Sequence, residues 1–422
     1  MELLSRRSGP LSGRVTAPSS KSVTHRSILF GMMAGGRMEI RHPLLSDDTE
    51  STLDAAVLMG ADVKKGKTLV MESEMHQAAD VINARNSGTT ARLLSSICAL
   101  MDGHSVVTGD ASLRGRPMGP IMDAVRQLGG TAFSTLGNER LPAVFGGKLT
   151  KGYAAMRGDI SSQFASSLAM SCPLKEGSTE VALDGGIQSA DYLTLTLEMV
   201  EYFGGEARLE SDRLFFSGDG SYRPRNIAVP GDYSSAAFLL ASAAVTSGSV
   251  RVDNLSRSFT QADARIAEYL RAFGCAVSER PGSLTAESGG LVAADVDCTR
   301  SPDLFPVLCV VASCAAGVST VRGSPNLRLK ETDRIETTSV MLRSLGVGFR
   351  AEGETLHIRG SRDGVRGGIV DSCGDHRIAM AACVAGLSSK KGVRVKGAEC
   401  HSVSYPGFVG DIRKAGGKAE LK

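Results

Sequence analysis

A sixfold internal repeat constrains the fold of this 422-residue chain more than any other feature of its sequence. A helical pattern that ends at a glycine and continues into a short alternating segment recurs along the chain, as in DAAVLMGADV, LEMVEYFGGEA and SVMLRSLGVGF. These glycines follow one another at intervals of 69 to 75 residues: Gly60, Gly129, Gly204, Gly274, Gly346 and Gly416. Glycine favours a left-handed helix C-cap because it carries no Cβ. A fixed period of this length indicates a repeated structural unit.

Each repeat also contains an earlier helical pattern that begins at a polar cluster, as in KSVTHRSILFGMMA, SGTTARLLSSICAL and GDHRIAMAACVAG. These patterns are apolar nearly all round, so we expect buried helices whose N-termini lie at one end of the core. Several of the segments after the repeat glycines alternate in polarity around polar turn residues, which predicts β-hairpins. The sequence therefore predicts six α/β units, each with two helices separated by strands.

Basic residues lie where the first helix of several repeats begins: Lys21 and Arg26 in one, Arg92 in another and Arg377 in a third. A cation beside a helix N-terminus opposes the helix dipole, so an anion is expected between them. Taken singly, the Ser, Thr and Asp residues at these positions are better explained as ordinary N-caps. The basic loops LRGRPMGP and SPNLRLKETDRIE are likewise typical of a solvated surface. The basic residues and the polar helix starts recur together in several repeats, which favours a site for several anionic groups.

Composition and missing motifs exclude several other classes of protein. A formal charge of +3 is too small to indicate nucleic acid as the main partner. The nine cysteines form no CxxC pair, so we expect reduced core residues in a cytosolic protein. The chain contains no Walker loop, dinucleotide fingerprint, zinc-protease motif or esterase elbow. The N-terminus lacks the apolar region of a secretory signal, and the uncharged stretch 304–321 predicts a buried helix and a strand.

Eight motifs along essentially the whole chain resemble one enzyme family: PSSKSVTHR, NSGTTAR, LRGRPM, SSQF, GDYSSA, PDLFP, NLRLKETDR and GDHRIAM. They occur in the order and at the spacing of the 5-enolpyruvylshikimate-3-phosphate synthases, which are 3-phosphoshikimate 1-carboxyvinyltransferases. The resemblance implies an α/β fold, a two-domain inverted α/β barrel built from six βαβαββ-type units. It also implies a discontinuous domain of residues 1–20 and 231–422, an inserted domain of residues 21–230, and an active site in the cleft between them.

The resemblance implies a reaction as well, the transfer of the enolpyruvyl group of phosphoenolpyruvate to the 5-hydroxyl of shikimate 3-phosphate. Addition must protonate the methylene carbon of phosphoenolpyruvate, and elimination must remove a proton and phosphate, so acids and bases are needed in both steps. The resemblance makes Asp303 the base toward the hydroxyl, Glu331 the proton donor to the methylene, and Lys330 a charged partner that relays a proton. Lys21 completes the implied catalytic set.

The same resemblance supplies the binding residues. Shikimate 3-phosphate is expected at Lys21, Ser22, Arg26, Ser161, Ser162, Gln163, Ser189, Tyr192, Asp303, Asn326 and Lys330. Phosphoenolpyruvate is expected at Lys21, Asn86, Gly88, Arg116, Gln163, Arg334, His376 and Arg377. Arginine suits this task because its guanidinium binds carboxylate and phosphate with two parallel hydrogen bonds. We expect no metal and no cofactor, no nucleic-acid or membrane partner, and a cytoplasmic monomer.

Two alternatives share part of this pattern. UDP-N-acetylglucosamine enolpyruvyl transferase has the same fold and cosubstrate, but it typically carries a reactive cysteine in the loop that here reads GDASLRGRP. A non-catalytic anion-binding relative, or an RNA-end-processing protein built from related units, would not need the set of Asp303, Lys330 and Glu331. The motifs SSQF and KETDR favour the shikimate enzyme over the UDP-N-acetylglucosamine enzyme, and the complete set of Asp303, Lys330 and Glu331 argues against the second alternative.

Two positions depart from the family's pattern. Asp191 precedes Tyr192 where the family usually has a proline. Val403 stands where the family usually has a lysine that closes on the phosphate of phosphoenolpyruvate. We therefore expect weaker binding of phosphoenolpyruvate, and of glyphosate, which occupies the same site in this family. His401 is expected to lie on the same side of an extended segment as Val403 and to replace the lysine in part.

Overall fold

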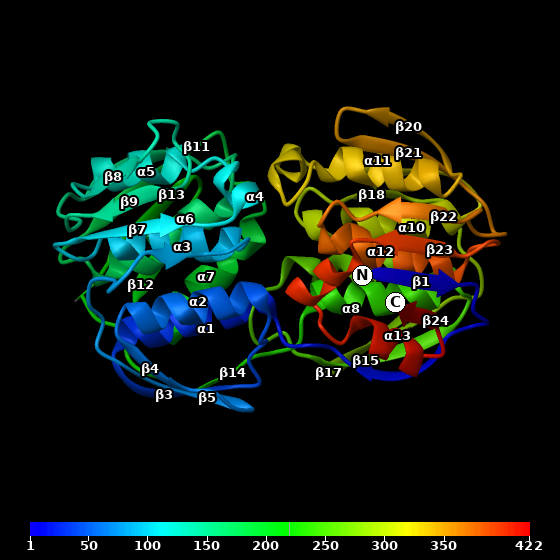
Figure 1. Ribbon diagram of the computed structural model, residues 1–422, viewed down its shortest axis with the longest axis horizontal. Coiled ribbons are helices and arrows are strands. Elements are labelled where there is room, and N and C mark those ends of the chain that lie inside the picture. Colours follow the sequence, from blue (N-terminus) through cyan, green and yellow to red (C-terminus); the bar gives the residue numbers. More distant parts are fainter. Residues whose placement is uncertain (219) are drawn as a thin grey trace. The chain divides into compact units, whose positions relative to one another are not determined.

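The computed structural model describes residues 1–218 and 220–422, which divide into two compact units. Unit 1 comprises Met1–Pro18 and Pro230–Lys422, and unit 2 comprises Ser19–Val229. Both chain termini belong to unit 1 (Figure 1). Each unit is built from three four-stranded sheets and the helices that connect their strands. The predicted inverted α/β barrel of repeated units is thereby confirmed as the fold class.

One repeat of unit 2 illustrates the pattern of all six sheets. Strand β6 (Ile82–Asn83) pairs in parallel with β7 (His104–Thr108). The hairpin of β8 (Thr131–Ser134) and β9 (Ala143–Gly146) then adds in antiparallel fashion, with β9 next to β7 and Val107 opposite Ala143. A helix connects β6 to β7 and further helices connect β7 to β8, which gives the order βαβαββ.

Three repeats complete their sheets with a strand from a distant part of the chain. The N-terminal strand β1 (Glu2–Arg6) pairs with β23 (Val393–Lys396) and β24 (Lys418–Leu421), so it joins the last repeat. Strand β2 (Ser12–Thr16) pairs in parallel with β15 (Ser249–Leu255). In unit 2, β14 (Ile227–Ala228) pairs in parallel with β3 (Gly36–Arg41). These pairings join the N-terminal segment to the rest of unit 1 and the end of unit 2 to its beginning.

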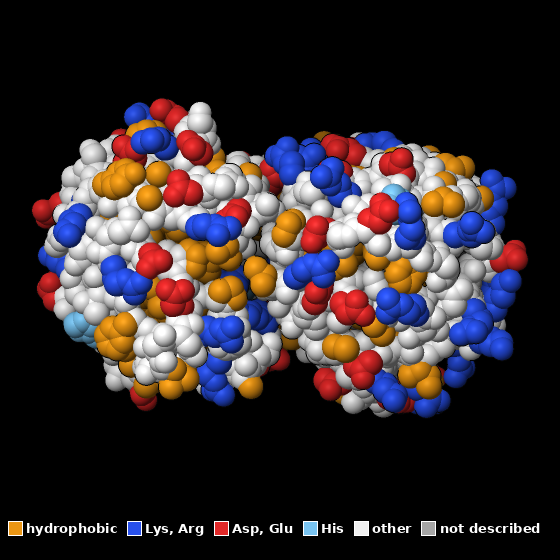
Figure 2. All heavy atoms as spheres, turned by 90° about the horizontal axis from the view of Figure 1, so that it is seen from above, with side chains coloured by type: hydrophobic (Ala, Val, Ile, Leu, Met, Phe, Trp, Pro, Cys, Tyr) orange, Lys and Arg blue, Asp and Glu red, His pale blue; other side chains and the backbone are white. Residues whose placement is uncertain are grey.

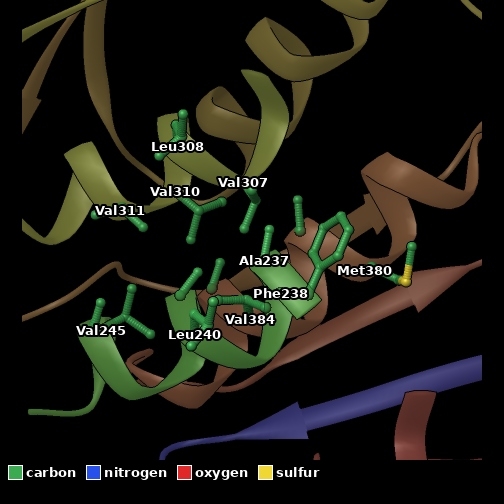
Figure 3. Packing of buried hydrophobic residues seen from close by; sticks show 14 of the residues in the cluster. Ala237, Phe238, Leu240, Val245, Val307, Leu308, Val310, Val311, Met380 and Val384 are labelled. Atoms are coloured by element: carbon green, nitrogen blue, oxygen red, sulfur yellow. The ribbon is translucent and has the colours of Figure 1, made fainter. Parts of the chain in front are cut away.

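The first helices of the repeats are α1 (Lys21–Ala34), α3 (Gly88–Cys98), α6 (Ser162–Ser171), α8 (Tyr233–Val245), α10 (Phe305–Cys314) and α12 (His376–Leu387). They are buried almost throughout, as their apolar sequences predict. In unit 1, Figure 3 shows Phe238 of α8 close to Val307 of α10 and Met380 of α12. Burial of each such side chain stabilises the fold by about 1.5 to 3 kcal/mol.

The second helices of the repeats lie nearer the surface and end as the sequence predicts. They are α2 (Asp47–Leu58), α5 (Gly119–Gln127), α7 (Ala190–Tyr202), α9 (Ile266–Ala272), α11 (Arg334–Ser344) and α13 (Phe408–Lys414). The six repeat glycines that follow them have φ between 74° and 102°. At Gly60 a Cβ atom would also lie 2.2 Å from the carbonyl oxygen of Glu74. Only glycine fits this chain reversal.

The predicted hairpins are present as β4 (Ala61–Lys64) with β5 (Thr68–Ser73), β12 (Glu206–Glu210) with β13 (Arg213–Ser217), β16 (Ala276–Arg280) with β17 (Gly282–Glu287), and β20 (Gly348–Glu352) with β21 (Thr355–Gly360). The other strands are β10 (Tyr153–Arg157), β11 (Thr179–Asp184), β18 (Asp295–Asp297), β19 (Gly317–Arg322) and β22 (Gly368–Asp371). Short helices complete the chain: α4 (Ala111–Arg114), η1 (Cys172–Leu174), η2 (Ala262–Arg265), η3 (Pro302–Leu304), η4 (Pro325–Leu329) and η5 (Ala398–Val403).

Two expectations about composition are tested by burial. The uncharged stretch 304–321 forms helix α10 and most of β19, as predicted, and none of the helices in the described residues is long and apolar enough to span a membrane. The nine cysteines are free thiols, but Cys373 is exposed, so the prediction that all are core residues is wrong there.

On the face drawn in Figure 2, Lys and Arg side chains are interspersed with Asp and Glu side chains.

Candidate active site

The candidate residues fall into two groups, one in each unit, at the N-terminal ends of the helices. The group in unit 2, here called the Lys21 half-site, contains Lys21, Ser22, Arg26, Asn86, Gly88, Arg116, Ser161, Ser162, Gln163, Ser189 and Tyr192. The group in unit 1, here called the Asp303 half-site, contains Asp303, Asn326, Lys330, Glu331, Arg334, His376 and Arg377. Each half-site is described separately.

Lys21 is the first residue of α1, where Ser20 caps the helix by accepting a hydrogen bond from the amide of Val23. Its ammonium lies 2.9 Å from Oδ2 of Asp48, near the start of α2. This ion pair holds the ammonium in place, although a cation beside a helix N-terminus is by itself unfavourable.

The starts of α3 and α6 lie side by side and are joined by four polar side chains. Nη1 of Arg92 donates to Oε1 of Gln163 at 2.9 Å and to Oγ of Ser161 at 3.4 Å. Nε2 of Gln163 donates in turn to Oγ1 of Thr89 at 2.9 Å. The guanidinium of Arg92 also lies over the ring of Phe164, 5.2 Å from its centroid. Two of the three helix starts predicted to share an anion site in unit 2 are thus in contact.

Arg116 approaches the same end of α3 from the loop after α4. Its Nη2 donates to Oδ1 of Asn86 at 3.0 Å, and its buried Nε has no hydrogen-bond partner among the described residues. Gly88, the first residue of α3, leaves room for this guanidinium, since a Cβ there would lie 3.0 Å from Nη1 of Arg116. Asn86 is held by Asp110, whose Oδ2 accepts from its amide at 2.6 Å. A cation with unused donors therefore sits beside a helix N-terminus.

Arg26 is buried within unit 2, where its guanidinium donates to protein oxygens. Nε donates to Thr196 Oγ1 at 2.8 Å, Nη1 to the carbonyl of Ser22 at 3.1 Å, and Nη2 to the carbonyl of Tyr192 at 3.3 Å. Burial lowers the pKa of Arg26 to about 10. Ser189, which precedes α7, has left-handed backbone angles of φ 53° and ψ 50°. Arg26 and the first turn of α7 are thus held together.

Arg334 is the centre of the Asp303 half-site, with 1% of its side chain exposed. Its three nitrogens contact three carboxylates: Nε lies 2.8 Å from Oδ2 of Asp375, Nη1 lies 2.8 Å from Oδ1 of Asp303, and Nη2 lies 2.6 Å from Oε2 of Glu331. Burial opposes the charge on Arg334, but Asp375, Glu331 and Asp303 outweigh it and raise its pKa above the ordinary value. The arrangement brings together side chains from η3, α11 and the start of α12.

Asp303 receives two further cations. Nη2 of Arg377 lies 3.1 Å from its Oδ2, and Nζ of Lys330 lies 3.5 Å from its Oδ1. Burial opposes ionisation of Asp303, but Lys330, Arg377 and Arg334 together hold its pKa well below the usual range. Arg377 is buried over the ring of Phe238, and within the part of the chain that the structure describes its Nε and Nη1 have no hydrogen-bond partners. The half-site therefore contains buried N–H groups that can donate hydrogen bonds to an anion.

The remaining predicted residues border this cluster. Asn326 lies in η4, where its Oδ1 accepts from Oγ of Ser324 at 2.6 Å. His376 is the buried first residue of α12, directly before Arg377. Among the described residues, no cluster of three His, Cys, Asp or Glu side chains is placed to hold a metal ion.

Sequence reasoning missed the acidic residues that hold the cations. Asp48 binds Lys21, and the fully buried Asp375 binds Arg334. Asp263 was also missed: burial, then the nearby Asp303, raise the pKa of Asp263 to about 7, although Arg377 lies close to it. Asp375 lies directly before the predicted His376-Arg377 pair, so the unmatched charge of that pair was the available signal.

One expectation about the C-terminal segment is wrong. His401 lies in the 3-10 helix η5, not in an extended run, so it does not alternate with Val403 as a strand residue would. Its side chain is buried, with Nδ1 3.0 Å from the carbonyl oxygen of Tyr405, and its ring packs near Phe408. His401 is therefore a packing residue of unit 1 and is not positioned to replace a lysine at position 403.

Comparison with known proteins adds an independent finding. A family model described as EPSP synthase (3-phosphoshikimate 1-carboxyvinyltransferase) matches residues 5–412. The 3-phosphoshikimate 1-carboxyvinyltransferase of Methanocella arvoryzae is 42% identical over 420 residues, covering 97% of each chain. That of Aeropyrum pernix is 40% identical over 410 residues, covering 97% of this chain and 94% of its own. A solved structure of EPSP synthase from Acinetobacter baumannii has a TM-score of 0.85 and 28% identity, covering 100% of this chain and 99% of its own.

Proposed function

This chain belongs to the EPSP synthase (3-phosphoshikimate 1-carboxyvinyltransferase) family, and on that premise we propose that it transfers the enolpyruvyl group of phosphoenolpyruvate to the 5-hydroxyl of shikimate 3-phosphate. The products are 5-enolpyruvylshikimate 3-phosphate and phosphate. The observation that carries the proposal is the contact of Arg334 with both Asp303 and Glu331, because it unites an anion-binding group with the proposed base and acid.

Both half-sites take part in binding in this proposal. Shikimate 3-phosphate is held by Lys21, Ser22, Arg26, Ser161, Ser162, Gln163, Ser189, Tyr192, Asp303, Asn326 and Lys330. Phosphoenolpyruvate is held by Lys21, Asn86, Gly88, Arg116, Gln163, Arg334, His376 and Arg377. The unpartnered nitrogens of Arg116 and Arg377 support this assignment, since a buried donor gains a hydrogen bond when an anion arrives. The active site would then be shared by the two units.

The addition step forms one C–O bond and one C–H bond. The 5-hydroxyl oxygen attacks C2 of phosphoenolpyruvate while its proton passes to Asp303, and Glu331 gives a proton to C3, which becomes a methyl group. In the elimination step, the methyl group loses a proton to Glu331 and the C2–O bond to phosphate breaks, which restores the double bond, while the proton held by Asp303 passes to the departing phosphate and restores the carboxylate. Nζ of Lys330 lies 3.5 Å from Oδ1 of Asp303, so Lys330 is the charged partner that relays a proton to or from that carboxylate.

The ion pairs of Arg334 and Arg377 explain how substrate can activate these groups. While Arg334 binds Glu331 and Asp303, both carboxylates are held in their charged form, in which Glu331 cannot donate a proton. An incoming phosphate or carboxylate competes for the same arginine nitrogens and releases the two side chains. The pKa of Asp303 then rises, which makes Asp303 a better base, and Glu331, once released from Arg334, can carry the proton that it gives to C3.

The activity is tested by phosphate release from the purified protein. We expect phosphate only when phosphoenolpyruvate and shikimate 3-phosphate are both present. UDP-N-acetylglucosamine in place of shikimate 3-phosphate tests the related transferase activity, which we expect to be absent. No phosphate release with both substrates would contradict the proposal. We further propose a cytoplasmic monomer, for which sedimentation should give a mass near 44.1 kDa.

A further inference from the structure

A chain of buried hydrogen bonds connects helices α1, α2 and α3 beneath the Lys21 half-site. Nδ1 of His25 lies 2.6 Å from Oγ1 of Thr52, and that oxygen lies 2.6 Å from Oγ1 of Thr90. The hydroxyl of Thr90 donates to Oγ of Ser87 at 2.8 Å. All four side chains are fully buried. A polar chain through a helix interface fixes one arrangement of the helices, because each buried group must keep its partner.

Both ends of this chain reach residues of the Lys21 half-site. His25 lies one helical turn after Lys21 on α1. Ser87 is the N-cap of α3, where its Oγ accepts from the amide of Thr90, and it stands between Asn86 and Gly88. The chain thus connects the helix that carries Lys21 to the helix start beside Arg116.

A branch of the same chain reaches the partner of Lys21. The backbone carbonyl of Asp48 accepts from Oγ of Ser51 at 2.7 Å and lies 3.3 Å from Oγ1 of Thr90. Oγ of Ser51 also lies 3.0 Å from Oγ1 of Thr90. Asp48 in turn binds the ammonium of Lys21 at 2.9 Å. Thr90 is therefore the point at which contacts from α1, α2 and the cap of α3 meet.

We propose that His25 is a positioning residue for phosphoenolpyruvate binding, which acts through Thr52 and Thr90 to set the N-terminal end of α3 relative to Lys21. His25 touches no substrate in this proposal, which rests on the function proposed above. The fully buried position of His25 suits a neutral ring. Burial, and then the charges of Lys21 and Arg26, lower the pKa of His25 well below the ordinary value, so the ring stays neutral at physiological pH.

The test compares two substitutions of His25. His25→Asn keeps a neutral polar atom near the position of Nδ1 and removes the far edge of the ring, whose Nε2 has no hydrogen-bond partner among the described residues. His25→Leu fills similar space but cannot bind Thr52. We expect His25→Leu to raise the KM for phosphoenolpyruvate roughly ten- to a hundredfold, because misplacement by about 1 Å has effects of this size. We expect its KM for shikimate 3-phosphate to change less, and His25→Asn to stay within about threefold of the unaltered protein.

Two other residues of α1 provide controls. Ser27→Ala removes a buried hydroxyl without a hydrogen-bond partner, so it should change neither stability nor kinetics. Ile28→Ala leaves a cavity in the same helix and should lower the Tm without a selective rise in the KM for phosphoenolpyruvate. If His25→Leu behaves like Ile28→Ala, or if His25→Asn loses as much as His25→Leu, the positioning role is refuted.

Two measurements keep the test decisive. If His25→Leu does not fold, Thr52→Val breaks the chain one residue later with little change of shape, and it should give the same selective rise in KM. In ¹⁵N-histidine NMR, assigned by the signal lost in His25→Asn, Thr52→Val should shift the His25 ring nitrogens whether or not the protein turns over. An unaltered protein without turnover would refute the proposed function alone. Normal turnover with an unchanged KM in Thr52→Val would refute the positioning role alone.

Discussion

Asp303 and Glu331 are the residues on which the proposed proton transfers depend. Replacement by the neutral amides, Asp303→Asn and Glu331→Gln, keeps the shape of each side chain but removes its ability to exchange a proton. We expect kcat to fall about 10² to 10⁴-fold in each variant while the fold is retained. Cys98→Ser is the control, because burial raises the pKa of the Cys98 thiol to about 12 and leaves it unreactive. A loss of less than tenfold at either carboxyl would remove that residue from the mechanism.

Asp263 provides a prediction about pH. Its pKa in the folded protein is about 7, whereas an unfolded aspartate titrates near pH 4. Between these values the folded protein keeps a proton that the unfolded chain releases. The free energy of unfolding therefore falls by up to about 1.4 kcal/mol per pH unit as pH rises through this window.

Asp263→Asn removes this titration. Its stability relative to the unaltered protein should improve by about 2 kcal/mol between pH 5 and pH 8. Urea unfolding of both proteins at the two pH values measures the change. An equal stability difference at pH 5 and pH 8 would show that Asp263 does not carry a proton in the folded state at pH 5.

Val403 provides a third prediction at this scale, which rests on the family resemblance. It ends η5, the short helix that packs on α12, whose first residues are His376 and Arg377. A lysine there would add a charged contact, and a desolvated contact to phosphate contributes about 1.5 to 3 kcal/mol. We expect Val403→Lys to lower the KM for phosphoenolpyruvate and the inhibition constant for glyphosate together. Unchanged values of both would show that position 403 is remote from the phosphate.

The sequence indicates individual cations better than their partners. Lys21, Arg92 and Arg377 stand out because they lie beside predicted helix N-termini, where a cation is unfavourable. Asp48 and Asp375 look like ordinary N-terminal residues of helices, and only the packing of separate segments shows that they bind Lys21 and Arg334. Long-range pairs of this kind have no local signature in one sequence.

At the scale of the element, the repeat glycines carry the strongest local prediction. Gly60→Ala forces a left-handed backbone and places Cβ against the carbonyl of Glu74, so we expect a loss of at least about 1 kcal/mol of stability. Gly410 is the matched control, because it lies in the exposed part of α13 with open space around its Cα. Gly410→Ala should be neutral or stabilise by about 0.5 to 1 kcal/mol. Thermal unfolding of both variants measures the contrast, and an equal Tm would contradict it.

Periodicity predicts helices and hairpins of this chain well, since each is determined by residues close in sequence. The buried helix α10 and the hairpin of β20 and β21 are examples. The helix η5 shows the limit, because His401 and Val403 were expected to lie in an extended segment and lie in this helix instead. The contacts that decide its conformation come from α12 and from Phe408.

At the scale of the whole molecule, the two half-sites belong to different compact units. In the proposed function, shikimate 3-phosphate binds residues of both half-sites, such as Arg26 in one unit and Lys330 in the other. We therefore expect binding of shikimate 3-phosphate to draw the two units together. Small-angle scattering should show a smaller radius of gyration with the ligand. The same radius with and without it would count against this expectation.

The central claim is that this chain makes an enolpyruvyl ether by protonating and then deprotonating the methylene carbon of phosphoenolpyruvate. Mass spectrometry of the product formed in D₂O from phosphoenolpyruvate and shikimate 3-phosphate tests it directly. The account predicts a product with the mass of shikimate 3-phosphate plus the enolpyruvyl group, with deuterium in its methylene position, since the methyl group of the intermediate mixes one solvent deuteron with two original hydrogens. A product without deuterium, or no product when both substrates are present, would contradict the account.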